Sequence, residues 1–222
     1  MNFDFLSKYY MFFIDGAKFT IILAFFTVLI GSILGLFLAL LRLSNVKIFN
    51  IKILNIIATA YVEFIRGTPL MVQIFIIYYA LPDLIGINLP EMTSAVMALA
   101  INSGAYVSEI IRAGIQAVDK GQMEAARSLG MPYGMSMRYV IVPQAVKNIL
   151  PALGNEFVTI IKESSVVSVI GIKELMYNAD TVRGNTFRAF EPLIVAALVY
   201  FVMTFSLSKL MGWFERRMKT SD

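Results

Sequence analysis

Long apolar segments constrain this chain more than any other feature. Residues 19–41 contain no charged side chain, and about 20 apolar residues are enough for a helix to cross the hydrocarbon core of a membrane. This segment is too long for a cleaved signal peptide, and no A-x-A-type site follows it, so we expect it to stay in the membrane. Only 15% of the 222 residues are charged, whereas a soluble domain carries about a quarter. The sequence therefore predicts an all-α integral membrane protein.

Five segments have the length and composition of membrane spans, and we expect a five-span helical bundle. They cover about 18–41, 53–81, 92–111, 149–170 and 192–213, within a single transmembrane domain over residues 1–222. The second segment is long for one helix and contains Pro69, so either its first turns lie in the membrane interface or the helix bends there. The aromatic stretch 3–14 carries Asp4 and Lys8, and it is predicted to lie at the outer interface rather than to span.

Positive charge is distributed unevenly between the connections. The 42–55 and 111–148 connections and the C-terminal tail carry twelve Lys and Arg: Arg42, Lys47, Lys52, Arg112, Lys120, Arg127, Arg138, Lys147, Lys209, Arg216, Arg217 and Lys219. The opposite side carries five, namely Lys8, Lys18, Lys173, Arg183 and Arg188. Because cytoplasmic loops are rich in Lys and Arg, we expect the N-terminus outside and the C-terminus in the cytoplasm. The net charge of +4 follows from this placement and does not indicate a nucleic-acid partner.

The cytoplasmic loop 119–143 is predicted to contain two short helices. Asp119 can cap the first, Glu124 and Arg127 are spaced i,i+3, and Gly130 with the proline that follows can end it. The second runs from about residue 132 to 142 and is expected to end near Pro143. Small side chains at 125 and 126 favour close approach of another surface. The alternative is an amphipathic connector lying on the membrane.

This loop resembles the signature loop of ABC importer permeases. The shared pattern is Glu-Ala-Ala, three residues, Gly, nine residues, then two apolar positions and Pro. Here it consists of Glu124, Ala125, Ala126, Gly130, Val140, Val142 and Pro143, with valine where the family usually has Ile and Leu. Segments 61–70, 109–115 and 162–171 are similar to motifs of the polar amino acid uptake permeases. The resemblance covers about residues 16–215, nearly the whole chain.

The resemblance implies that the loop is a coupling helix docked on a cytoplasmic ATPase. The residues it assigns to ATPase coupling are Glu124, Ala125, Ala126, Arg127 and Gly130. Two ATPase subunits would bind ATP and Mg, because this chain contains no G-x-x-x-x-G-K-[ST] sequence of its own. The permease would pair as a homodimer, or as a heterodimer with a related permease, in the cell membrane of a prokaryote. An extracytoplasmic amino acid-binding protein would deliver the substrate, and membrane lipid would surround the spans.

Polar residues inside the predicted spans are candidates for the substrate path, because such residues are costly in lipid. The candidates are Asn155, Glu156, Thr159, Lys162, Glu163 and Ser164 in 149–170, Asn102, Ser103 and Tyr106 in 92–111, and Tyr61 in 53–81. Glu156, Thr159 and Glu163 are spaced to share one helical face. The alternative for Lys162 and Glu163 is a structural pairing with other spans. Glu109 and Arg112 are predicted to form a structural or gating pair near the cytoplasmic end.

An intramembrane carboxylate favours a ligand that carries a cationic group. The resemblance implies an importer of polar amino acids, and the carboxylate makes basic amino acids our first expectation, with glutamine or another polar amino acid as the alternative. The chain contains no Cys and no His, so we expect no disulfide, no metal site and no His-based catalysis. A secondary transporter driven by an ion gradient is a further alternative. It is disfavoured, because such folds tend to carry paired internal repeats and this sequence has none.

Overall fold

The structure is a computed structural model that describes residues 1–44, 52–86 and 88–219. Lys47, which belongs to the predicted cytoplasmic charge cluster, lies outside the described residues. All regular elements of the described part are helical: α1 (Leu6–Leu43), α2 (Ile53–Gly67), α3 (Leu70–Phe75), η1 (Ile76–Ala80), α4 (Leu81–Ile85), α5 (Glu91–Gln116), α6 (Lys120–Ser128), α7 (Tyr133–Ser136), η2 (Met137–Ile141), α8 (Val142–Glu163), η3 (Ser164–Ile170), α9 (Leu175–Thr186) and α10 (Glu191–Lys219). The predicted all-α class is confirmed.

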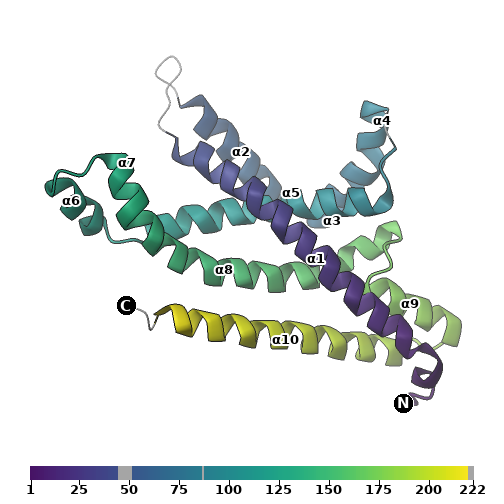
Figure 1. Ribbon diagram of the computed structural model, residues 1–222. Coiled ribbons are helices and arrows are strands. Elements are labelled where there is room, and N and C mark those ends of the chain that lie inside the picture. Colours follow the sequence, from purple (N-terminus) through teal and green to yellow (C-terminus); the bar gives the residue numbers. More distant parts are fainter. Residues whose placement is uncertain (45–51, 87, 220–222) are drawn as a thin grey trace.

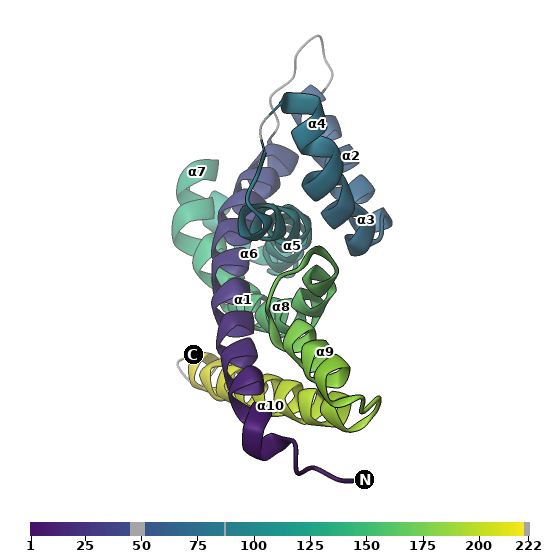
Figure 2. The same ribbon diagram turned by 90° about the vertical axis from the view of Figure 1, so that its right-hand side faces the viewer.

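Helices α5, α8 and α10 lie side by side, and α1 crosses them diagonally (Figure 1). In Figure 2, α2, α3 and α4 lie on one side of α5, and α8, α9 and α10 lie on the other. We call the end of the molecule that carries α6 and α7 the α6 end. The opposite end carries α9 and the start of α1, and we call it the α9 end.

The most extensive packing joins α1 to α5, and two glycines make it possible. A Cβ atom added to Gly35 would lie 2.6 Å from the Cβ of Val107, and one added to Gly31 would lie 3.0 Å from the Cβ of Ser103. The first distance is too short for a side chain, and the second leaves room for one only if Ser103 shifts, so the two backbones approach as a G-x-x-x-G spacing allows.

Three described helices are long and apolar enough to cross a membrane: α1, α5 and α10. A fourth candidate is α2 together with the segment that begins at Leu70, and its two parts meet at a bend of 108°. The predicted span 149–170 lies in α8 and the short η3, and α8 is too polar to belong to this group of helices. The described part of the chain thus has three helices, or four with the bent pair, that are long and apolar enough to cross a membrane, so the predicted count of five spans is not confirmed.

The bend in the second predicted span lies at Thr68 and Pro69. Both have extended backbone, which a proline imposes on the residue before it. Gln73 compensates for the broken helix, because its Nε2 donates to the carbonyl of Ile65 at 2.7 Å and to the Thr68 hydroxyl at 2.8 Å. Of the two predicted possibilities, the bend at Pro69 is the one that the structure contains.

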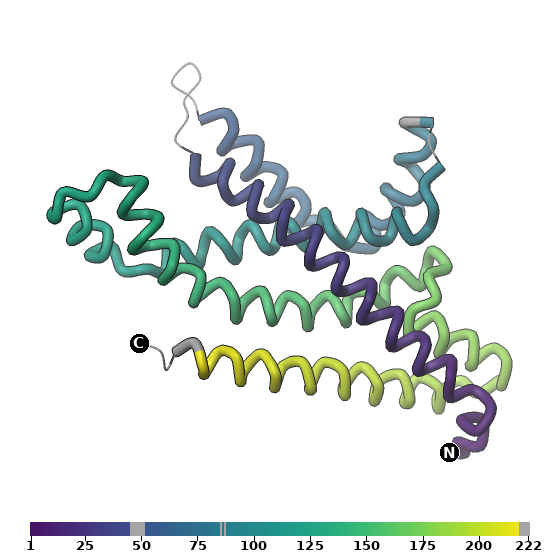
Figure 3. The backbone as a smooth tube through the Cα atoms, in the orientation of Figure 1, coloured from purple at the N-terminus to yellow at the C-terminus, as the bar shows by residue number. Residues whose placement is uncertain are grey.

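The start of the chain differs from the prediction of a separate interfacial segment. Residues 6–14 form the first turns of α1, which continues without a break to Leu43 (Figure 3). At about 1.5 Å per residue a helix of this length is about 57 Å long, whereas the hydrocarbon core is about 30 Å thick. One helix therefore combines a span with an extension beyond it.

One further prediction, the end of the second loop helix, is wrong. The second loop helix does not end near Pro143, because α7 passes through the π-helical turn η2 directly into α8, and Pro143 lies in the first turn of α8. Proline is tolerated there because the wider π-helical turn η2 relieves the clash of its ring with the preceding turn. The connection between η3 and α10 contains the helix α9.

Candidate functional site

Helix α6 occupies the predicted cytoplasmic loop, and its two ends are built as predicted. At its start, the Asp119 Oδ1 accepts a hydrogen bond from the backbone N–H of Gly121 at 2.7 Å. At its end, Gly130 adopts a φ of +84°. The N–H of Met131 then bonds the carbonyl of Ala126 at 3.2 Å, and the N–H of Gly130 bonds the carbonyl of Arg127 at 3.0 Å. This is the Schellman arrangement, which favours glycine at the left-handed position.

The residues assigned to ATPase coupling differ in accessibility. Glu124, Ala125 and Arg127 are exposed, whereas Ala126 is 5% exposed and faces the chain itself. Leu129 follows the helix with 85% of its surface exposed. The outer face of α6 and the turn after it are therefore free to meet another surface in the single chain.

A charged cluster joins three helices at the α6 end. Glu109 on α5 accepts from Arg42 on α1, with 2.8 Å between Arg42 Nη1 and Glu109 Oε2, and forms a second ion pair with Arg112. Arg112 also donates to Gln116 at 2.8 Å. The carbonyl of Arg42 accepts from Asn55 of α2. The predicted Glu109–Arg112 pair is thus present, and Arg42 is a third member that the sequence did not indicate.

The seam between α5 and α8 brings two of the predicted path residues together. Ser103 Oγ donates to Glu156 Oε1 at 2.9 Å, and Glu156 is 8% exposed. Thr159 and Glu163 are half-buried and follow at the spacing of one helical face. We call the face of α8 that carries Glu156, Thr159 and Glu163 the acidic face. In this chain it is directed toward α5.

The other polar residues of α8 and η3 do not join that seam. Asn155 and Lys162 are exposed. Ser164 is buried and donates to the carbonyl of Ile161 at 2.8 Å. Similar bonds run from Ser165 to Lys162 and from Ser168 to Ser165. These hydroxyls satisfy carbonyls of their own backbone where α8 tightens into η3, so the bonding of Ser164 is local.

A second polar seam joins α5 to the bent span. Asn102 Nδ2 donates to Gln73 Oε1 at 3.0 Å, and the Tyr61 hydroxyl donates to the carbonyl of Ile101 at 3.2 Å. Tyr106 is partly exposed, and the guanidinium of Arg66 lies 5.4 Å from its ring centroid. Apart from Asn155, Lys162 and Ser164, the predicted path residues therefore fall into two groups on different faces of α5, one toward α8 and one toward α2 and α3.

The buried carboxylate of Glu174 was missed by sequence reasoning. Glu174 is 0% exposed and accepts from the backbone N–H of Met176 at 2.9 Å and of Tyr177 at 2.7 Å. It also accepts from the Tyr200 hydroxyl at 2.6 Å. The neighbouring N–H of Leu175 donates to Thr20 on α1. Glutamate is not a preferred N-cap residue, so no sequence signal marked the site.

The Glu174 network closes the α9 end, because it ties α9 to both α1 and α10. Burial raises the pKa of Glu174 above its ordinary value, while the hydrogen bonds from Tyr200 and the backbone amides act in the opposite direction. No group of three or more His, Cys, Asp or Glu side chains within the described ranges is arranged to hold a metal ion.

Comparison with known proteins gives consistent matches over the full length. The chain is 43% identical over 224 residues to the arginine transport system permease protein ArtQ of Bacillus subtilis, with 100% of both chains covered. It is 40% identical to a protein named as a glutamine transport system permease, GlnP, of Rickettsia conorii, with 97% of this chain and 98% of the relative covered.

A solved structure is similar to this chain in both fold and sequence. It is a chain from a crystal structure of an amino acid ABC transporter with histidines, with a TM-score of 0.91 and 56% identity, covering 98% of this chain and 100% of that one. The profile described as "Binding-protein-dependent transport system inner membrane component" matches residues 31–220. This chain therefore belongs to the family of inner membrane components of binding-protein-dependent transport systems.

Proposed function

We propose that this chain is the membrane subunit of an ATP-driven importer of polar amino acids, and that basic amino acids are its preferred substrates. The observation that carries the proposal is the full-length similarity to ArtQ, an arginine transport system permease, together with an acidic face inside the helical bundle. Similarity to a protein named for glutamine transport supports glutamine as the second candidate substrate.

The whole chain acts as one permease domain with five membrane segments in this proposal. These are α1, the bent α2–α3 pair, α5, α8 with η3, and α10. The buried polar contacts of α8 support its place inside the bundle, since a helix with a buried glutamate cannot face lipid on all sides. The Lys and Arg distribution supports a multi-pass orientation with the N-terminus outside and the α6 end in the cytoplasm.

Helix α6 is the coupling element. Its exposed residues Glu124, Ala125 and Arg127 would contact a cytoplasmic ATPase subunit, with Gly130 holding the turn that follows. Two such subunits would bind ATP and Mg, and closure of these subunits on nucleotide would move the paired α6 helices and alternate the access of the pathway. The pathway would form between two permease copies, either identical or related. An extracytoplasmic binding protein would supply the amino acid.

The substrate path would run along the acidic face of α8. Glu163 and Thr159 are half-buried and follow Glu156 on one face. A carboxylate in a site of low dielectric constant attracts an ammonium or guanidinium group. Glu156 has Ser103 as a donor, so its role is also to hold α8 against α5, and Glu163 is the better candidate for the ligand. Asn155 and Lys162 would line the surface that meets the partner permease.

The test is uptake in proteoliposomes that contain this chain, its ATPase subunits and its binding protein. Arginine, lysine, histidine and glutamine are offered to wild type and to Glu163→Ala. We expect basic amino acids to be taken up in an ATP-dependent way, and the variant to lose at least about tenfold of that uptake, equivalent to about 1.4 kcal/mol. Glu91→Ala, which changes an exposed carboxylate in the first turn of α5, is the matched control.

Three outcomes would contradict parts of this proposal. Normal uptake by Glu163→Ala would make that carboxylate structural and leave selection to the binding protein. Uptake of glutamine alone would make glutamine, and not a basic amino acid, the substrate. Uptake in the absence of the ATPase subunits would remove the ATP-driven mechanism and favour a secondary transporter.

A further inference from the structure

Phe187, which follows the last turn of α9, has a backbone conformation that is unusual for an aromatic residue. Its φ of +53° and ψ of +27° lie in the left-handed region, and no other described non-glycine residue has a positive φ. Helices often end with a residue in this conformation, but it is usually glycine or sometimes asparagine. A bulky side chain there is a genuine outlier, and such outliers cluster at functional sites.

The side chain of Phe187 contributes no packing to the chain, because 96% of its surface is exposed. The backbone strain is therefore not compensated by burial of the ring. A glycine would fit the same turn without strain. The phenylalanine is thus unfavourable for the isolated chain on both counts, which points to a contact made outside it.

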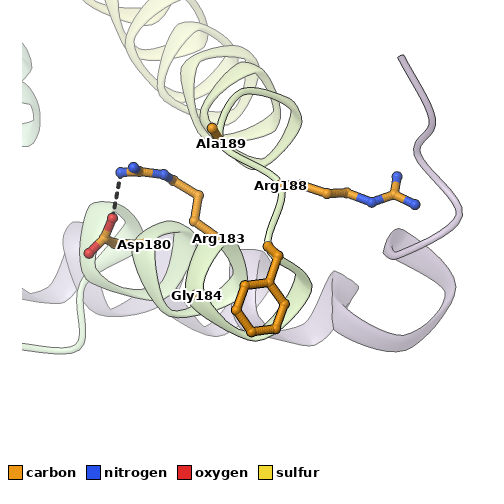
Figure 4. A pocket seen from close by; sticks show the side chains of 6 residues that line it. Asp180, Arg183, Gly184, Arg188 and Ala189 are labelled. Atoms are coloured by element: carbon orange, nitrogen blue, oxygen red, sulfur yellow. Dashed lines mark hydrogen bonds and ion pairs between the residues drawn. The ribbon is translucent and has the colours of Figure 1, made fainter.

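A cavity of about 350 Å³ adjoins Phe187 and is lined by both polar and apolar groups. Asp180 and Arg183 form an ion pair across 2.6 Å on one of its walls. Figure 4 shows Arg183 turned toward Asp180, and Arg188 turned the opposite way. Gly184 and Ala189 complete the lining and leave the cavity open beside the ring. A side chain of a partner could enter this space while the partner covers the ring.

The turn that carries Phe187 is bound to the first residues of the chain. Arg188 donates to the backbone carbonyl of Asn2, and its guanidinium lies 5.5 Å from the ring centroid of Phe5. The N–H of Asn2 donates to Glu191 at 3.4 Å. These contacts hold the turn between α9 and the first residues of the chain. An exposed aromatic side chain on a fixed turn loses little conformational freedom on binding, which is the property of an interface hot spot.

We propose that Phe187 and the adjoining cavity form a docking point for the extracytoplasmic amino acid-binding protein. The inference rests on the proposed function, since it takes the α9 end, which lies opposite α6 (Figure 1), as the outer end. The family is defined by its dependence on a binding protein, so such a partner is expected at this end.

The decisive variant is Phe187→Gly in the complete transporter, because it separates docking from stability. The ATPase activity is titrated with binding protein that carries its amino acid. We expect the half-saturating concentration of binding protein to rise about tenfold or more, as for loss of a hot-spot aromatic, while basal ATPase activity is unchanged. The thermal midpoint should stay the same or rise, because glycine relieves the strained φ. Phe187→Tyr keeps an aromatic ring, so its half-saturating concentration of binding protein should stay within about twofold of wild type.

Phe190 supplies a matched control. It is 59% exposed and lies three residues further along the chain with ordinary backbone. Phe190→Ala should leave the half-saturating concentration within about twofold of wild type. An unchanged titration for Phe187→Gly would overturn the proposal. So would a lower thermal midpoint in vesicles together with weaker assembly, since Phe187 would then be a lipid anchor or a permease–permease contact.

Sidedness is measured separately, so that failure of the proposed function can be recognised. The chain has no cysteine, so Phe187→Cys introduces a single thiol. A membrane-impermeant maleimide should label it from the outside of intact cells. Labelling only after the cells are opened would place the α9 end in the cytoplasm, and would overturn both the orientation and the docking proposal. Outside labelling with an unchanged Phe187→Gly titration would overturn the docking proposal alone.

Discussion

The two ends of this molecule are held together by different chemistry. At the α6 end, Glu109 is paired with Arg42 and Arg112, and their side chains are 23%, 11% and 32% exposed. At the α9 end, Glu174 is fully buried and is bound by a tyrosine hydroxyl and two backbone amides. One end thus relies on charges that water can reach. The other relies on neutral donors around a single buried carboxylate.

This difference determines which end is easier to open. Water can solvate the separated partners of a partly exposed ion pair, so separating them costs little. A buried carboxylate with three donors has no such replacement, because every donor left unpaired carries its own desolvation cost. The comparison therefore assigns rigidity to the α9 end and adaptability to the α6 end, where α6 would move with the ATPase.

The largest effect is expected for Glu174→Ala. The substitution removes the acceptor of Tyr200 and of two backbone amides in a site without solvent. Because each buried unsatisfied donor costs about 1–3 kcal/mol, we expect the free energy of unfolding to fall by about 3 kcal/mol or more. Unfolding in mixed micelles of increasing SDS content measures it.

The matched variant Glu174→Gln keeps an acceptor oxygen and should recover a large part of that loss. A loss below about 1 kcal/mol for Glu174→Ala would show that water or a rearranged hydroxyl replaces the carboxylate. The α9 end would then not be the more rigid of the two ends.

Local sequence signals were sufficient to predict the two ends of α6. Asp119 and Gly130 mark the ends of α6 through their own backbone chemistry, and the structure contains both the cap and the left-handed turn. The apolar runs likewise predicted α1, α5 and α10. The predicted helix end at Pro143 was wrong, because the wider π-helical turn η2 relieves the clash of the proline ring with the preceding turn.

Tertiary contacts decide what the sequence could not predict. Helix α9 contains Asn178, Asp180 and Arg183, so its composition resembles a loop. It is stabilised by burial of Leu175 and Val182 against α1 and α10. Asn102 was predicted from the cost of a polar group in a span, but that cost does not say which seam the side chain faces. The partner of Asn102 is Gln73, which repairs the break at Pro69.

A smaller effect is expected for Glu109→Gln at the α6 end. The substitution removes the charge that Arg42 and Arg112 share, but both guanidinium groups keep access to water. We expect a loss of about 1 kcal/mol in the free energy of unfolding, declining with added salt because the pairs are partly screened. The exposed pair of Lys18 and Asp15, at 3.6 Å, is the control, and Asp15→Asn should change nothing measurable. A loss equal to that of Glu174→Ala, without salt dependence, would contradict the contrast between the ends.

The smallest effect is a pH dependence confined to the α9 end. Burial raises the pKa of Glu174 in the folded chain, whereas the unfolded chain keeps the ordinary pKa of about 4.3. The folded state therefore binds this proton more tightly. Its stabilisation is complete below the unfolded pKa and is lost as the pH rises through the folded pKa.

The free energy of unfolding of the wild type should thus contain a component that decreases as the pH rises above about 4.3. Glu174→Gln cannot titrate and should lack this component, while all other groups contribute equally to both proteins. SDS unfolding at a series of pH values gives the two curves, and their difference isolates Glu174. Parallel curves would mean that the donors from Tyr200 and the backbone fully offset burial, so that the carboxylate remains charged without cost at the rigid end.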